Sequence, residues 1–404
     1  MGKEFSRLNP VVLSARLIDA VIEKGEFPPE AIQRVIWGMV MPDPNIYSIA
    51  REAVLASGLD NRVEAYSVSR ACATSLQSAA NAASFYHSFP DEKSVTLVGG
   101  VESFSSGRPI VTDEASEFFK MMGNPRASLS RKLEAFFKTP IKKFFPVAPS
   151  AKEYSTGLTM GEHCEMMVKE FKVSRERQDV LALASHRNAS RAREFLKEQI
   201  IAVEGVQKDT LIREETSLEA LASLPPVFDK KNGTITAGNS SPYTDGSAAL
   251  SVVSPALEKE IRPDAHLLDY EFVAVEPMKG LLMGPGKAML RLLSRNRLKW
   301  PDFAYIESHE AFAGEVLCNV DAMNDPGYRR TVYGVDYDPG KLDEKVLNPW
   351  GSSIAYGHPF GATGTRMLNQ AITFLQKEKG ELAILGICTA GGLAGGCILR
   401  RAHI

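Results

Sequence analysis

The sequence predicts a layered α/β fold built from two copies of one unit. Segments with helical spacing of apolar residues alternate with short apolar runs typical of buried strands, which favours sheets covered by helices. The order of these segments in the N-terminal part returns in the C-terminal part. A polar and mainly helical segment, residues 112–235, separates the two parts and is typical of an insertion that covers one face of the core.

The N-terminal part alternates helix and strand from its beginning. Residues 11–23 have helical spacing of apolar side chains, and residues 35–40 form an apolar run that predicts a buried strand. A second helix, "SIAREAVLASG", ends at Gly58. The strand "VEAYSVSR" then leads into a helix of small residues, "CATSLQSAANAASFYHS", and the strand "SVTLVGGVES" follows.

The C-terminal part repeats these features. A helix, a proline and a strand follow one another in residues 11–40 and again in 286–307. A loop of small residues that opens a helix, followed by an apolar strand, occurs in 67–100 and again in 351–386. The C-terminal part also has a strand, 267–275, before its first helix, whereas the N-terminal part has no counterpart because its sequence begins almost at the helix.

Composition and charge exclude several classes of function. The 404 residues have a formal net charge of −2, so no overall basic field indicates binding to nucleic acid. No apolar run is long enough to span a bilayer. The five cysteines are odd in number and contain no CxxC pair, and no secretion signal is recognisable. This usage indicates reduced thiols in a cytoplasmic compartment.

A cysteine at the beginning of a helix is the first candidate catalytic residue. Cys72 follows the strand "VEAYSVSR", and the positive end of the helix would lower the pKa of its thiol. Taken alone, this position favours an inert buried cysteine. His358, in "GHPFGATG", lies in the C-terminal loop that corresponds to the Cys72 loop, and its imidazole is suited to take the thiol proton. If the two halves pack about a pseudo-twofold axis, both side chains face one centre.

Further candidates lie at the ends of strands. Cys388 ends the strand "ELAILGIC", and the glycine turn after it exposes backbone N–H groups that suit an oxyanion hole. His309 and Glu310 lie at a strand end in "SHEAFA", where helix capping by Ser308 and Glu310 is the alternative interpretation. The pair does not complete an HExxH zinc motif. The remaining cysteines are interpreted as structural: Cys164, Cys318 and Cys397.

Five motifs, in this order, resemble those of the thiolase family: "SRACATS", "TAGNSSPYTDGSAAL", "HEAFA", "GHPFGATGTR" and "CTAGGLAGG". The resemblance covers nearly the whole chain, and the set is far more specific than any one motif. It implies a five-layered αβαβα fold of two pseudo-twofold-related halves with mixed sheets and a helical loop insertion. The division it implies is an N-terminal half, 1–111, a loop domain, 112–235, a completion of the N-terminal half, 236–262, and a C-terminal half, 263–404.

The resemblance also implies a role for each candidate residue. Cys72 would be the nucleophile that takes the acyl group, and His358 would activate it and donate to the enolate oxygen of the departing acetyl-CoA. Cys388 would protonate that enolate and later deprotonate CoA. His309, where the family often has Asn, would hold the water that completes this first oxyanion hole. The backbone N–H groups of Cys72 and Ala390 would form a second hole for the acyl oxygen, although many thiolases have Gly at the latter position. The pantetheine tunnel would be lined by Met160, Ser241, Ala311 and Phe312.

The activity implied is that of a 3-ketoacyl-CoA thiolase of fatty-acid β-oxidation, which forms acetyl-CoA and a shortened acyl-CoA through an acyl-cysteine. CoA is then a substrate, and no metal or other cofactor is needed. "HEAFA" and "AYGHPFGATG" are most similar to the thiolase subunit of the trifunctional complex. Three alternatives stay open: acetoacetyl-CoA synthesis, a decarboxylating ketoacyl synthase and a degenerate acyl-CoA or lipid binder. Cys388 argues against the synthase, and the retained catalytic residues argue against the binder.

The resemblance implies a dimer or a larger homo-oligomer. Residues 129–146 are basic and aromatic, which suits contact with a hydratase/dehydrogenase α subunit or with a membrane surface, while a surface helix that packs its aromatic side chains on the core is the alternative. Thiolases normally have a core strand before the first helix, as the comparison of the two halves also indicates. We therefore expect either translation from upstream of Met1 or a shortened chain, with an unpaired sheet edge and lower stability.

Overall fold

The structure, a computed structural model, describes residues 4–147 and 152–402. Contacts divide the chain into two compact units, one of residues 107–152 and one of all the rest. Both sheets and every candidate catalytic residue belong to the larger unit. Most of the predicted insertion, residues 153–235, also belongs to the larger unit, and the finer division expected from the sequence stays a prediction.

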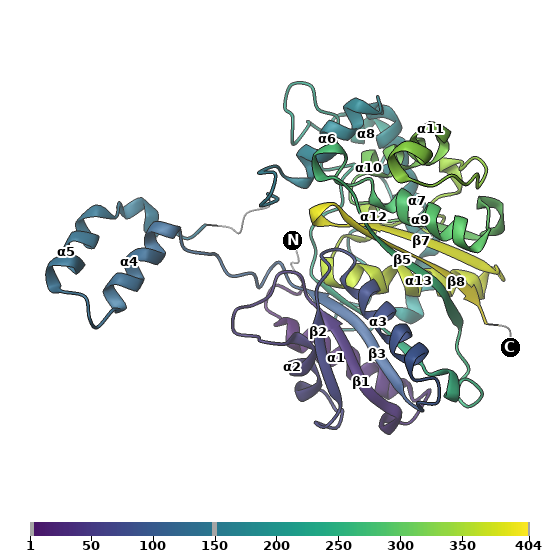
Figure 1. Cartoon of the computed structure of the whole chain (residues 1–404), viewed down its shortest axis with the longest axis horizontal. Helices are drawn as coiled ribbons and strands as arrows, with labels where there is room; N and C mark the ends of the chain where they lie inside the picture. Colours follow the sequence, from purple (N-terminus) through teal and green to yellow (C-terminus); the bar gives the residue numbers. More distant parts are fainter. Residues whose placement is uncertain (1–3, 148–151, 403–404) are drawn as a thin grey trace. The chain divides into compact units, whose positions relative to one another are not determined.

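The first sheet has four strands in the order β2-β1-β3-β4 (Figure 1). Strands β1 (Ile32–Gly38), β2 (Glu64–Val68) and β3 (Val95–Glu102) are parallel, and β4 (Gly246–Val253) is antiparallel to β3. All eight residues of β3 are buried. Such a continuous apolar run is typical of a strand that is covered on both faces.

The second sheet also has four strands, in the order β5-β8-β7-β6. Strand β6 (Tyr305–Ser308) is parallel to β7 (Leu382–Cys388), whereas β8 (Leu393–Arg401) is antiparallel to both β7 and β5 (Ala265–Ala274). Both sheets are therefore mixed, as the resemblance to thiolases implied. By order and direction β4 corresponds to β8, but the side of β4 that would match β5 has no strand among the described residues.

Two helices lie between the sheets and contact each other. Helix α3 (Thr74–Ser88) packs on β1 and β3, and α13 (Thr363–Lys377) packs on β4, β7 and β8. Their approach is close at Gly364, where a Cβ atom would lie 2.5 Å from the backbone nitrogen of Leu76. A side chain at Gly364 would force the two helices apart.

Outer helices complete a five-layered arrangement. Helices α1 (Pro10–Lys24) and α2 (Ile49–Ala56) cover the first sheet, and α9 (Gly284–Asn296) covers the second. Helix α10 (Ala313–Asn324) packs beside α9. The predicted order of layers, αβαβα, is thereby confirmed. The other helices of this unit are α6 (Met160–Glu170), α7 (Arg175–Leu196), α8 (Leu218–Ala222), α11 (Pro326–Tyr328) and α12 (Ser353–Tyr356).

The smaller unit contains helices α4 (Asp113–Gly123) and α5 (Leu129–Lys138). The rings of Phe118 and Phe144 pack edge to face at 4.8 Å between centroids. Helix α5 buries no residue, and Phe137 is 81% exposed. Most of the aromatic surface predicted in this segment is therefore open to solvent.

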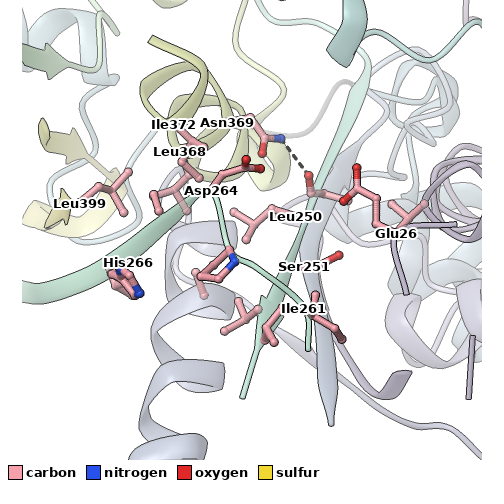
Figure 2. Close-up of a pocket in the computed structure, with 18 of the residues that line it drawn as sticks. Glu26, Leu250, Ser251, Ile261, Asp264, His266, Leu368, Asn369, Ile372 and Leu399 are labelled. Atoms are coloured by element: carbon pink, nitrogen blue, oxygen red, sulfur yellow. Dashed lines mark hydrogen bonds between the residues drawn. The ribbon is translucent and has the colours of Figure 1, made fainter. Parts of the chain in front are cut away.

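A groove of about 850 Å³ runs along the free edge of β4 (Figure 2). Leu250 and Ser251 of β4 line it together with Leu368 and Ile372 of α13. Every residue of β4 is only half-buried, although its sequence is typical of a core strand. The Asn369 side chain donates a 2.8 Å hydrogen bond to the carbonyl oxygen of Ala249 and so satisfies part of this edge.

Candidate active site

Cys72 lies in a strained turn between β2 and α3. The preceding residue, Ala71, has φ of 44°, an uncommon conformation for a residue with a side chain. Thr74 supports the turn, because its hydroxyl donates to the Ala71 carbonyl at 2.7 Å and accepts from the Arg70 N–H at 2.8 Å. The Cys72 side chain is thereby fixed in the interior at the beginning of the helix, with the residue only 3% exposed.

Burial dominates the acidity of the Cys72 thiol. It raises the pKa to about 12, although the backbone N–H groups of Ala390 and of Cys72 itself lower it by hydrogen bonding. The lowered pKa expected from the helix dipole is therefore wrong. A buried thiol of this kind is protonated, so it needs a neighbouring base before it can act as a nucleophile.

His358 is a neutral imidazole with one free nitrogen. Its Nδ1 lies 2.7 Å from the Thr363 hydroxyl, which donates its own proton to the Pro359 carbonyl at 3.1 Å. With the Thr363 proton on the Pro359 carbonyl, we assign the imidazole proton to Nδ1, which leaves the Nε2 lone pair free. Burial and then the charge of Arg366 lower the pKa of His358 to about 3. Nε2 has no hydrogen-bond partner in the part of the chain that the structure describes.

Tyr243 links His358 to Cys72. Its backbone pairs with that of His358, and it lies close enough to Cys72 for their charges to interact. Cys388 also interacts electrostatically with Cys72. The two loops that the sequence placed in corresponding positions of the two halves therefore meet at one site.

His309 lies beside His358, with ring centroids 4.3 Å apart. Its Nδ1 is 2.9 Å from the Ser353 hydroxyl, which in turn accepts a hydrogen bond from Arg366 at 3.0 Å. The Ser353 proton is then available to Nδ1, so Nε2 of His309 carries a proton. Burial, followed by the charges of His358 and Arg366, holds the pKa of His309 well below its usual value. Two neutral imidazoles thus lie side by side, and within residues 4–147 and 152–402 neither Nε2 has a partner.

Glu310 supports the loop rather than capping a helix. Its carboxylate accepts hydrogen bonds from the Ser185 hydroxyl and the Asn348 amide, each at 2.6 Å. Helix α10 begins only at Ala313, and its N-cap residue makes no side-chain hydrogen bond. The capping interpretation of "SHEAFA" is therefore wrong: β6 ends at Ser308, and Glu310 joins α7 to the loop that contains Asn348.

Cys388 is the last residue of β7 and is completely buried. Burial, and then the charges of Glu315 and Cys72, raise the pKa of its thiol well above the usual value. In the turn that follows, Gly391 has φ of 75°, whereas Ala390 is outside the positive-φ region. The turn therefore accepts a side chain at Ala390 while the N–H group of this residue points at the sulfur of Cys72.

The segment of Ala311 and Phe312 connects the predicted tunnel residues. The N–H group of Ser241 donates to the Ala311 carbonyl at 2.9 Å, which joins two of them directly. Phe312 packs edge to face on Phe228 and, with Met160 at the beginning of α6, borders the large core cluster around α9 and α10. Their role in holding pantetheine stays a prediction.

The sequence reasoning did not find the residues that orient the two imidazoles. Thr363 and Arg366 lie in the motif "GHPFGATGTR", and Ser353 lies four residues before it. The only feature of the sequence that could have indicated their role is that each side chain can form hydrogen bonds. Arg366 is half-buried, forms an ion pair at 2.6 Å with the fully buried Glu307, and donates a hydrogen bond to the Ser353 hydroxyl.

Comparisons with known proteins agree with this geometry. The family model of the thiolase N-terminal domain matches residues 1–256, and that of the thiolase C-terminal domain matches residues 261–401. The chain belongs to the thiolase family. A 3-ketoacyl-CoA thiolase of Escherichia coli (strain 55989 / EAEC) is 36% identical to this thiolase, over 99% of the chain and 93% of the relative.

Two further relatives extend the comparison. A 3-ketoacyl-CoA thiolase of Shigella flexneri serotype 5b (strain 8401) is 35% identical over 98% of this thiolase and 92% of its own length. The crystal structure of the Bacillus anthracis acetyl-CoA acetyltransferase superposes with a TM-score of 0.80 at 26% identity, over 98% of this chain and 94% of that one. The predicted family and fold are therefore confirmed.

Proposed function

We propose that this thiolase cleaves 3-ketoacyl-CoA with CoA, giving acetyl-CoA and a shortened acyl-CoA. The observation that carries the proposal is the meeting of two buried thiols, Cys72 and Cys388, with two neutral imidazoles, His309 and His358, whose Nε2 atoms are unpartnered within the described residues. The relatives of 35–36% identity, which are named 3-ketoacyl-CoA thiolases, support it. CoA is a substrate in this reaction, so we propose no metal or other cofactor.

The first half of the reaction breaks a carbon–carbon bond. His358 Nε2 takes the Cys72 proton, and the thiolate attacks the 3-keto carbon while the N–H groups of Cys72 and Ala390 bind the developing oxyanion. The C2–C3 bond then breaks, and its electrons form the enolate of acetyl-CoA. The protonated Nε2 of His358 and a water held by His309 donate to the enolate oxygen. Cys388 gives its proton to C2, and an acyl group stays on Cys72.

The second half returns every group to its starting state. The Cys388 thiolate takes the proton of the CoA thiol, and the CoA thiolate attacks the acyl-Cys72 carbonyl. The Cys72 thiolate leaves and regains its proton from His358. The lowered pKa of His358 suits this cycle, because an imidazole that is neutral at rest accepts the proton and readily returns it.

A thiolysis assay tests the proposal. CoA and 3-ketoacyl-CoA substrates of short and long chain are given to the wild type and to Cys72→Ala, and acetyl-CoA release is measured. We expect cleavage that disappears in the variant. Cleavage of acetoacetyl-CoA alone would favour the acetyl-CoA acetyltransferase activity of the Bacillus anthracis relative. A folded wild type that cleaves nothing would contradict the proposal and favour an acyl-CoA binder.

We also propose that the protein is a cytoplasmic homo-oligomer and that residues 129–146 contact either a hydratase/dehydrogenase subunit or a membrane surface. All five cysteines are free, which suits a reducing compartment. The segment combines lysines with exposed apolar side chains such as Phe137 and Ile141, exposed by 81% and 82%. No helix within residues 4–147 and 152–402 is long and apolar enough to cross a bilayer, so a membrane contact would be peripheral.

Light scattering and vesicle flotation test these assignments. Light scattering gives the number of copies in the oligomer. Flotation with anionic vesicles, compared between the wild type and Phe137→Ser, tests the membrane contact. Equal flotation of the two proteins would remove the membrane from this proposal and leave the partner subunit.

A further inference from the structure

Glu315 is a buried carboxyl group for which the reaction above has no use. It lies in the first turn of α10 and is 0% exposed. One oxygen, Oε1, accepts a 3.3 Å hydrogen bond from the Asn319 amide. The other, Oε2, has no hydrogen-bond partner among the described residues, and the carboxyl group lies close enough to the Cys388 thiol for each group to shift the pKa of the other. A buried acid next to the proposed proton donor requires an explanation.

The surroundings of Glu315 favour its neutral form. Burial, and then the charge of Glu310, raise its pKa well above the usual value. The positive end of α10 acts in the opposite direction, but burial outweighs it. Among the described residues, Glu315 interacts electrostatically with acidic groups on the elements around it: Glu310 before α10, Cys164 of α6, Cys318 of α10, Tyr333 after α11 and Cys388 of β7.

We propose that Glu315 is a positioning residue that, as a neutral acid, donates a hydrogen bond to the Cys388 thiolate formed during the reaction. The role rests on the proposed function of Cys388. When Cys388 gives its proton to C2, a negative charge develops on its sulfur in an apolar cluster. The Glu315 O–H group donates a hydrogen bond to the charged sulfur and keeps its own proton. The CoA thiol later returns a proton to Cys388. An ionised Glu315 would instead place a second negative charge beside the Cys388 thiolate, and the repulsion would oppose formation of that thiolate.

Exchange of the methyl protons of acetyl-CoA in D₂O tests the role directly. This exchange measures proton transfer at C2. It needs no free CoA, so the titration of the CoA thiol does not distort the pH profile as it would in thiolysis. Wild-type exchange should fall at the alkaline pH where Glu315 ionises. Glu315→Gln keeps a donor that does not titrate, so it should lower exchange at pH 7 by no more than about tenfold and remove the alkaline fall. Glu315→Leu has no donor and should lower exchange by about 10- to 100-fold, the range for a lost hydrogen bond to a charged group.

Glu165→Gln is the matched control. Glu165 is also buried, with one carboxylate oxygen unpartnered in the described part of the chain, but its other oxygen accepts from the backbone N–H groups of Thr234 and Ile235. Its variant should keep the wild-type pH profile. An alkaline fall that persists unchanged in Glu315→Gln would overturn the role of Glu315 while thiolysis by the wild type still supports the proposed function. A folded wild type with neither exchange nor thiolysis would overturn both.

Discussion

Thr363→Val should slow the formation of the acyl-enzyme without unfolding the protein. The substitution keeps the shape of the side chain but removes the hydroxyl that lies 2.7 Å from Nδ1 of His358. The Nδ1–H group then has no acceptor in a completely buried site, and a buried donor without a partner costs about 1–3 kcal/mol. The ring can avoid this cost only by moving its proton to Nε2, which removes the base that Cys72 needs. We expect the rate of acylation to fall by about 10- to 100-fold.

The assay is single-turnover acylation of Cys72 by a 3-ketoacyl-CoA, followed by mass spectrometry of the protein. Thr365→Val is the matched control, because Thr365 lies two residues further along α13 and its buried hydroxyl has no partner among the described residues. It should acylate at the wild-type rate and be at least as stable. An acylation rate of Thr363→Val within about threefold of the control rate would refute the reasoning. Such a loss in rate is well below the loss expected for an unpaired buried donor.

Three more predictions follow from the structure. Burial raises the pKa of Glu102 from 4.5 to about 7, so the folded state binds this proton more tightly than the unfolded state. The free energy of unfolding should therefore fall by about 3 kcal/mol as the pH rises from about 4.5 to 7. Denaturant titrations should show a flatter pH dependence in Glu102→Gln, and an unchanged slope would contradict the assignment. His309→Ala should lower kcat for thiolysis by about 100-fold, as for the loss of one oxyanion-hole donor, whereas His309→Asn should retain more activity because an amide also holds water. Equal losses in these two variants would exclude hydrogen bonding as the role of His309. An apolar strand added before Met1 and designed to pair with β4 should raise the melting temperature, because it would fill the groove and satisfy the free edge. An added strand with lysines at the inward positions should bring no such gain.

The sequence was sufficient to predict the fold and the main candidates, because both depend on local patterns. Cys72, His358 and Cys388 lie where a strand or loop meets a helix or a glycine turn, and the repeated order of elements places two of these junctions in corresponding positions. The parallel between the halves also indicated that one edge of a sheet would be unpaired. The layered α/β order, the two related halves and these three candidates require only periodicity, turn chemistry and the order of elements, whereas the five layers and mixed sheets were implied by the resemblance to thiolases.

The electrostatics of the site could not be predicted in this way. The dipole of a helix is a local property, and it indicated an acidic Cys72 thiol. Burial is a property of the whole fold, and it reverses the direction of the shift. For the same reason the sequence left helix capping open as an alternative for Glu310, since the partners that hold it, Ser185 and Asn348, are distant in the sequence. The proton on His358 is oriented by Thr363, and the sequence shows the hydroxyl of Thr363 but not its contact with the imidazole.

The close contact at Gly364 couples sequence changes in one half to sequence changes in the other. Each half has its own sheet and resembles the other in the order of its elements, as two copies of one ancestral unit would. Yet a side chain at Gly364, in the second half, would collide with the backbone of Leu76 in the first. Neither copy can therefore change this surface alone, and a chimera that joins one half to that of a distant relative should work only if both sides of the contact come from the same parent.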